Sequence, residues 1–251
     1  MKHCIKNKGI IGAGRKTKGH SSNGITVLTI SVKYSSCCDY NIHLFLKSLT
    51  HSLIFTLKII LASKSPRRQQ LLSDLGIRFS LLLTEVDETY PADLHIGKVP
   101  EYLSAKKADA IRNLIKTDEL LIAADTVVLF EDQIFGKPEN TEEAKKMLTI
   151  LSGNIHEVIT GVTLLTKDKA VTFSELTSVH FRKLSDSVIN HYVETFHPFD
   201  KAGGYAIQEW IGLVGIEKIS GCYYNVMGLP VCRLVKELES FGINLLHNQD
   251  Q

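Results

Sequence analysis

The chain has few cysteines. None of them forms a Cys-x-x-Cys pair or has the sequence spacing to a histidine that is typical of zinc sites. The five thiols are therefore expected to stay reduced, as in a cytoplasmic protein. No apolar stretch reaches the roughly 18–20 residues of a membrane span, so no membrane association is expected. The sequence also lacks the dinucleotide-binding glycine fingerprint, the Walker phosphate loop and the serine nucleophile elbow. These absences exclude the commonest signatures of nucleotide-binding proteins and serine hydrolases.

Charge is distributed unevenly along the 251 residues. Residues 1–57 carry eight Lys or Arg and a single acid, whereas residues 58–251 carry 21 bases and 26 acids. Such a change marks a boundary. We expect 1–57 to be a basic leader without chemistry, disordered or translated from a misassigned start, and 58–251 to be the functional domain. Aromatic residues do not alternate with the basic ones in the leader, so nucleic acid is not an expected partner.

Strand and helix patterns alternate through residues 58–251. Strands are expected over residues such as 58–63, 122–130 and 213–219, and one of the helices over 100–116. This order predicts an α/β fold: a mixed β-sheet with helices on both faces, folded as one domain or as two close lobes.

The segment Ser65-Pro66-Arg67-Arg68 follows the first expected strand. Ser65 is suited to the N-cap and Pro66 to the first helical position. Two arginines in a first turn oppose the helix dipole, which favours acids there. Free backbone N–H groups and two guanidinium groups would instead bind an anion such as phosphate. The alternative is a solvated basic turn.

Asp125 lies inside Ile122–Leu129, a strand that is apolar on both faces. An ionised carboxylate is costly there unless a cation, a metal or a hydrogen-bond network compensates it, which points to function. Lys107 is expected near the centre of an apolar helical arc formed by Leu103, Ala110, Ile111 and Leu114. It either extends its ammonium group to solvent or directs it into a phosphate-binding groove.

Three further segments could contribute to a site. Lys137 follows Gly136 at a strand end, which alone carries little information. The segment 200–208 is more informative, because its glycine pair permits close approach of a ligand and Gln208 offers an amide that donates and accepts. The alternative for this segment is a tight turn with an ion pair at its mouth. His156 has no metal-binding partner nearby in sequence and is interpreted as structural.

Several blocks, in order and over about residues 58–242, resemble the Maf family of nucleoside triphosphate pyrophosphatases. They are Leu61–Arg68, Val86–Glu88, Ala124–Val128, Gly136–Pro138, Leu151–Gly153 with His156, Thr160–Val162, Asp200–Gln208 and Asn225–Pro230. The resemblance implies a fold like that of inosine triphosphate pyrophosphatase, with two lobes around a central groove, and a homodimer.

The resemblance also implies an activity. A nucleoside triphosphate would be cleaved between its α and β phosphates with a divalent metal cation (Mg, Mn or Co). Asp125 would activate water and, with Glu88, contact the metal. The implied substrate-binding residues are Ser63, Arg67, Arg68, Lys107, Thr126, Lys137 and Gln208.

Members of the family differ in the base that they accept. Arg67, Thr126 and Gln208 match the branch that acts on dTTP and UTP. The branch that acts on 7-methyl-GTP tends to have an aromatic residue, Gln and Glu at these places, which suits a cationic base. Two alternatives stay open: 7-methyl-GTP hydrolysis, and a nucleotide-binding inhibitor of septum formation.

Overall fold

The computed structural model of the protein describes residues 57–245. The leader expected over 1–57 therefore lies outside the described residues, apart from Leu57, which packs against the core of the domain that follows. The boundary itself stays a prediction. None of the helices between residues 57 and 245 is long and apolar enough to cross a membrane.

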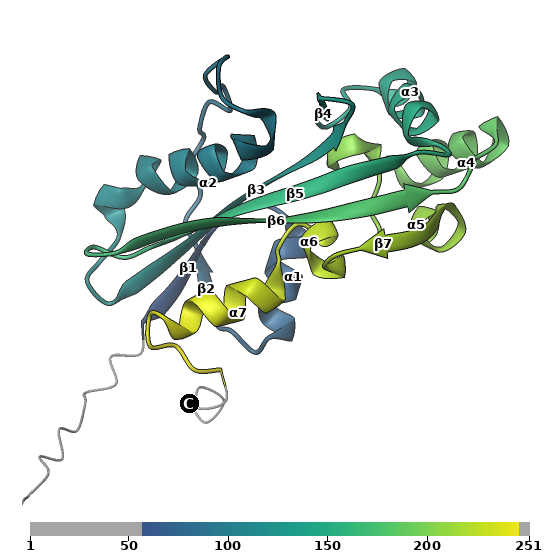
Figure 1. Ribbon diagram of the computed structural model, residues 1–251. Helices are drawn as coiled ribbons and strands as arrows, with labels where there is room; N and C mark the ends of the chain where they lie inside the picture. The colour runs from purple at the N-terminus through teal and green to yellow at the C-terminus, as the bar shows by residue number, and fades with distance from the viewer. Residues whose placement is uncertain (1–56, 246–251) are drawn as a thin grey trace, which may run out of the picture. The chain divides into compact units, whose positions relative to one another are not determined.

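Seven strands form one mixed sheet in the described part of the chain (Figure 1). The order is β2-β1-β3-β5-β6-β7, and β4 pairs with β3 beside this path. β1 runs parallel to β2 and β3, whereas the other pairs are antiparallel. The strands are β1 (Lys58–Ala62), β2 (Phe79–Leu81), β3 (Glu119–Phe130), β4 (Gln133–Phe135), β5 (Ile155–Leu165), β6 (Ala170–Phe181) and β7 (Ile216–Ser220).

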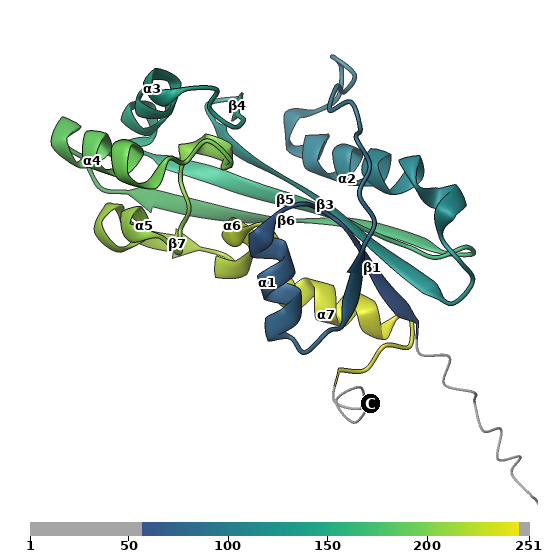
Figure 2. The same cartoon turned by 180° about the vertical axis from the view of Figure 1, so that it is seen from behind.

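Helices flank the sheet on both faces, which confirms the expected fold class. Figures 1 and 2 show α2 on one face of the long strands and α1 and α7 on the other. The helices are α1 (Pro66–Asp74), α2 (Val99–Ala110), α3 (Thr141–Leu151), α4 (Asp186–Phe196), α5 (Trp210–Gly215), α6 (Tyr223–Met227) and α7 (Val231–Glu239).

The apolar run of β1 is explained by this two-sided cover. Successive side chains of a strand point to opposite faces. Ile59 and Leu61 therefore pack with residues of α1 and α7, whereas Ile60 packs with Ala108 of α2. A strand buried on both faces loses the alternation of polar and apolar residues, as the sequence of β1 shows.

A second hydrophobic cluster lies at the other end of the long strands. It joins α3, α4 and α5 to the distal halves of β3, β5 and β6, through residues such as Leu148, Tyr192 and Ile211. The cluster that packs β1 with α1 and α7 corresponds to one expected lobe, and this second cluster corresponds to the other. β3 and β5 contribute residues to both.

One edge of β3 is open between these lobes. β1 pairs with β3 as far as Ala62 opposite Ala123, and β4 begins to pair at Val128 opposite Phe135. Residues 124–127 therefore have no strand neighbour on this side, whereas β5 pairs with all of them on the other. Asp125 and its neighbours line a pocket at this gap.

Three local expectations were wrong. The strand expected over 213–219 is shorter, because Trp210–Gly215 form α5 and β7 begins only at Ile216. The helix expected over 100–116 ends at Ala110 and continues as a 3-10 turn. Ala110 still belongs to α2 but lies on its exposed face, because the buried face passes through Leu103 and Ala108. The change of helix type after Ala110 rotates the later side chains, so Leu114 is 62% exposed, and both residues lie outside the expected apolar arc.

Candidate active site

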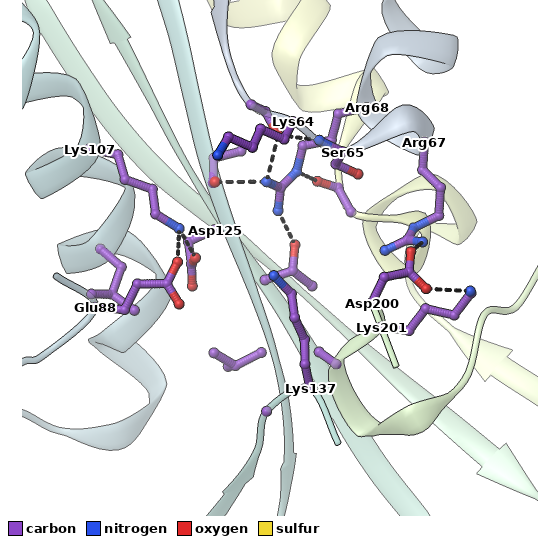
Figure 3. A pocket seen from close by; sticks show the side chains of 18 of the residues that line it. Lys64, Ser65, Arg67, Arg68, Glu88, Lys107, Asp125, Lys137, Asp200 and Lys201 are labelled. Atoms are coloured by element: carbon purple, nitrogen blue, oxygen red, sulfur yellow. Dashed lines mark hydrogen bonds and ion pairs between the residues drawn. The ribbon is translucent and has the colours of Figure 1, made fainter. Parts of the chain in front are cut away.

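A pocket of about 950 Å³ lies at the open edge of β3. The end of β1, the first turn of α1, Lys107 of α2 and three loops line it. Figure 3 shows charged side chains from these distant segments pointing into the same space. The site residues expected from the sequence all line this pocket: Ser63, Arg67, Arg68, Glu88, Lys107, Asp125, Thr126, Lys137 and Gln208.

The turn before α1 has an unusual cap. Ser65 occupies the N-cap position and Pro66 follows at the first helical position, but the Ser65 side chain makes no capping hydrogen bond. Instead the Ser63 hydroxyl accepts the Ser65 N–H at 3.2 Å. The first turn contains no acid, so its N–H groups and the positive end of the helix dipole are available to an anion.

Arg68 joins three parts of the fold. Its guanidinium group donates to the Gly228 carbonyl at 2.7 Å, the Ala124 carbonyl at 2.9 Å, Thr126 Oγ1 at 2.9 Å and Ser63 Oγ at 3.2 Å. Burial lowers the pKa of Arg68, and the charge of Asp125 opposes this shift. Of the five N–H donors of an arginine, these bonds leave one for a ligand. Arg68 therefore supports the pocket more than it contributes free cationic surface.

Asp125, Lys107 and Glu88 meet on one side of the pocket (Figure 3). Lys107 Nζ lies 2.5 Å from Asp125 Oδ1 and 2.7 Å from Glu88 Oε1. Asp125 is only 8% exposed, so this ammonium group supplies the compensating charge that a buried carboxylate requires. The lysine points into the groove, as one of the two interpretations of the sequence expected.

The pKa of Glu88 reflects the same grouping. Burial raises it, but the hydrogen bond and charge of Lys107, with the charges of Lys137 and Arg68, outweigh burial and lower the pKa overall. Glu88 is therefore ionised at neutral pH. The Glu88 carboxylate is then available as an anionic ligand beside Asp125.

Lys106 holds the loop that carries Glu88, a role that the sequence did not suggest. Its Nζ donates to the Thr89 carbonyl at 2.9 Å and lies 3.7 Å from Asp87 Oδ2. Asp87 in turn accepts hydrogen bonds from the Thr89 backbone and hydroxyl. Neighbouring lysines of α2 thus fix the turn and the carboxylate that projects from it.

Arg67 lies on the opposite side of the pocket from Asp125 (Figure 3). It donates to Asp200 Oδ2 at 2.9 Å, and Lys201 Nζ lies 2.6 Å from Asp200 Oδ1. Lys64 and Lys137 also line the pocket, and no ion pair involves either among residues 57–245. Lys64 was missed in the sequence because an isolated lysine between two serines carries no pattern.

His156 lies in the core of the second lobe. It is 1% exposed, its Nε2 lies 2.7 Å from the Tyr205 hydroxyl, and its ring packs edge-on against Phe181 and Tyr205. Burial lowers the pKa of His156 from 6.5 to about 4. These contacts agree with the structural role expected for it.

The described residues contain no group of three or more His, Cys, Asp or Glu side chains that could hold a metal. Asp125 and Glu88 nevertheless converge on one ammonium group at an open pocket. Mg²⁺ is usually bound through one or two carboxylates, with substrate phosphates and water as its other ligands. The donor set present therefore fits a metal that arrives with a phosphorylated substrate.

The fold and pocket define an α/β protein with a cleft that lysine and arginine side chains line around a buried carboxylate. The chain belongs to the family described as Maf-like protein, whose sequence profile matches residues 58–241.

Relatives with an assigned name cover the same domain. A dTTP/UTP pyrophosphatase of Parabacteroides distasonis is 51% identical over 185 residues, which are 73% of this chain and 96% of that protein. Another, of Cytophaga hutchinsonii, is 54% identical over 192 residues, which are 76% of this chain and 88% of that protein. Among solved structures, the Staphylococcus aureus Ham1 protein matches 49% of this chain and 71% of its own, with 14% identity and a TM-score of 0.38.

Proposed function

We propose that this chain hydrolyses dTTP and UTP between the α and β phosphates, giving a nucleoside monophosphate and pyrophosphate. Relatives about 50% identical over most of the chain carry the name dTTP/UTP pyrophosphatase, which supports this substrate class. One observation of the structure carries the mechanism. Asp125 and Glu88 meet on Lys107 in a pocket that also holds free lysines.

The triphosphate binds across the pocket. Lys64, Lys137 and the first turn of α1 offer positive potential that no carboxylate in the described chain neutralises through an ion pair. The Ser63 hydroxyl accepts from Ser65 and Arg68, so its hydrogen is free to be donated to a phosphate oxygen. The one N–H of Arg68 that makes no bond among the described residues is likewise available to donate to a phosphate oxygen.

Asp125 acts as the general base. Its Oδ1 is held by the Lys107 ammonium group, which fixes the carboxylate and leaves Oδ2 to accept the proton of an attacking water. Water attacks the α phosphorus, the proton passes to Asp125, and pyrophosphate leaves with the electrons of the broken P–O bond. Lys107 stabilises the ionised carboxylate before attack and the developing charge afterwards.

Glu88 and Asp125 are the residues that would hold a divalent cation, which we propose to be Mg²⁺, Mn²⁺ or Co²⁺. Such a cation, when bound, neutralises charge on the phosphate oxygens. Lys106 keeps Glu88 at this place by fixing its turn.

Arg67, Thr126 and Gln208 select the base. Gln208 is exposed to the pocket, and its amide can match the N–H and carbonyl groups of uracil or thymine. Thr126 is held by Arg68 and by the Thr160 hydroxyl at 2.9 Å. A carboxylate in place of Gln208 would instead suit the cationic 7-methylguanine.

The homodimer and the cytoplasmic location belong to the same proposal. Their support is the family resemblance and the unpaired thiols Cys222 and Cys232. The solution mass measured by light scattering tests the dimer: a mass of one chain at assay concentration would contradict it.

The test is a panel of dTTP, UTP, CTP, ATP and 7-methyl-GTP incubated with the purified chain and Mg²⁺ or Mn²⁺. We expect monophosphate and pyrophosphate from dTTP and UTP. The variant Asp125→Asn should bind dTTP but turn it over at least about 10³-fold more slowly. Asp118→Asn, which removes an exposed ion pair with Lys58, is the matched control and should keep full activity.

Three results would contradict the proposal. Release of a nucleoside diphosphate and inorganic phosphate would place the cleavage between the β and γ phosphates, which is not the proposed bond. Faster turnover of 7-methyl-GTP than of dTTP would assign the chain to the other branch. Unchanged turnover in Asp125→Asn would remove the proposed base.

A further inference from the structure

The segment 200–209 is closed into a ring by one buried lysine. Lys201 Nζ lies 2.6 Å from Asp200 Oδ1, at the start of the segment, and 3.2 Å from Glu209 Oε1, at its end. The Lys201 side chain is only 9% exposed. A buried ammonium group between two carboxylates is costly to disrupt, because its loss leaves unpaired charge. Lys201 thus acts as a clamp on the two ends of the segment.

Tyr192 of helix α4 holds the same segment through two further hydrogen bonds. The Tyr192 hydroxyl donates to Glu209 Oε2 at 2.7 Å and accepts the Ala206 N–H at 3.2 Å. Tyr192 is fully buried, and its pKa is raised by burial, by the hydrogen bond with Glu209 and by the charge of Glu209. The middle and the end of the ring are therefore fixed to the core of the second lobe.

The ring exposes Asp200 and Gln208 to the pocket, and Asp200 is already paired with Lys201 and Arg67. Residues 203–207 are buried, whereas Gln208 is exposed and lines the pocket. Gly203 has a φ of 69°, and a Cβ there would lie 2.9 Å from the side chain of Val128, so the ring packs directly on β3. Gln208 makes no hydrogen bond within residues 57–245, so its amide is free for a ligand while its backbone is held on both sides.

Arg67 depends on the same clamp. Asp200 accepts from Lys201 through Oδ1 and from Arg67 through Oδ2, at 2.6 and 2.9 Å. Burial raises the pKa of Asp200, but its bonds to Lys201 and Arg67 outweigh burial and lower it overall. Lys201 therefore fixes the carboxylate that orients Arg67. Its own charge is shared between two acids, so it is a poor phosphate ligand although it lines the pocket.

We propose that Lys201 is a positioning residue for base selection, joining Asp200 and Glu209 so that Arg67 and Gln208 face the base together. This inference rests on the proposed pyrophosphatase function and goes beyond it. It predicts that losing Lys201 weakens discrimination between bases while binding of the phosphate groups is kept.

The experiment compares the wild type with Lys201→Met, Lys201→Arg and Glu209→Gln. The matched control is Lys145→Met, because Lys145 forms an ion pair with Glu194 in the same lobe and lies outside the pocket. For each protein we would measure kcat and KM with dTTP and with 7-methyl-GTP, and inhibition by pyrophosphate. Thermal unfolding identifies variants that fail to fold.

Lys201→Met is expected to lower the ratio of kcat/KM for dTTP over 7-methyl-GTP about tenfold or more, mainly through the KM of dTTP. Inhibition by pyrophosphate should stay within about twofold of the wild type, since it reports phosphate binding alone. Lys201→Arg should restore part of the ratio, and Glu209→Gln should fall between the wild type and Lys201→Met. Should Lys201→Met fail to fold, Glu209→Gln decides the question alone.

An unchanged ratio in the folded variants would overturn the inference. Equal losses of dTTP and pyrophosphate binding would do the same, because Lys201 would then be a phosphate ligand. Both results leave the proposed function intact, since the wild type still turns over dTTP. Absence of turnover in the wild type would remove the proposed function and the inference with it.

Discussion

Substitution of Gly161 by alanine tests how the fold brings Lys107 to Asp125. Gly161 of β5 lies opposite Asp125 of β3 in the antiparallel register, so the two residues face the same side of the sheet. A Cβ on Gly161 would lie 2.2 Å from the backbone carbon and oxygen of Pro100, at the start of α2. The missing side chain is what allows α2 to lie this close to the sheet.

The size of the effect follows from that distance. The start of α2 must move by about 1.2 Å to reach the 3.4 Å at which ordinary contact begins, and backbone atoms cannot rotate away as a side chain can. Overpacking of this kind costs about 1–3 kcal/mol, or about 3–10 °C in Tm for a domain of this size. Lys107 lies two turns further along the same helix. A displacement of about 1 Å at a catalytic group can reduce the rate about 10²-fold.

We expect Gly161→Ala to be folded but less stable, with kcat for dTTP reduced about 10- to 100-fold and a smaller change in KM. Thermal unfolding gives the stability, and steady-state kinetics well below the unfolding midpoint give the rate. Gly97→Ala is the control, because a Cβ there would meet only side-chain atoms, at 3.4 Å or more, just before the same helix. Wild-type stability and rate in Gly161→Ala would refute the reasoning, since α2 would then tolerate the extra atom.

Three other predictions test separate contacts. Because burial lowers the pKa of His156 from 6.5 to about 4, the unfolded chain binds a proton between these values that the folded chain does not. The wild type should therefore lose about 3 kcal/mol of unfolding free energy as the pH falls through this window, and His156→Gln should lose less; parallel pH profiles in urea unfolding would contradict this. Arg68→Lys removes the guanidinium group that joins Gly228, Ala124 and Thr126, and should cost about 2 kcal/mol or more in urea unfolding, beyond any change in KM. Gln208→Glu should lower kcat/KM for dTTP and UTP relative to 7-methyl-GTP about tenfold, and equal losses on all three substrates would argue against base selection by this residue.

Much of the fold could be predicted because its signals are local. The apolar run of β1, the proline that opens α1 and the alternation of strands and helices depend on propensity and periodicity over a few residues. The expectations that were wrong also concern local geometry. The segment 210–215 is apolar and short, and periodicity cannot distinguish a strand from a helical turn at that length.

The candidate site was predictable where a residue contradicts its surroundings. Asp125 stands out as a carboxylate in a strand buried on both faces, and Arg67 and Arg68 stand out as bases at the start of a helix. The partners of these residues could not be deduced in the same way. Nothing near Arg68 in the sequence indicates that the Gly228 and Ala124 carbonyls would occupy two of its five donors.

The sequence by itself determined the class of fold, the family, and which side chains had to be explained by a ligand or a partner. The tertiary structure alone decided which charges are paired and which stay free for a ligand. It joined Arg67 to Asp200 across 133 positions, made Lys201 a clamp and left Lys137 without an ion pair to any residue between 57 and 245. The physical reason is that side-chain pairing depends on strand register and helix placement, such as the contact at Gly161, and these follow from packing of the whole domain.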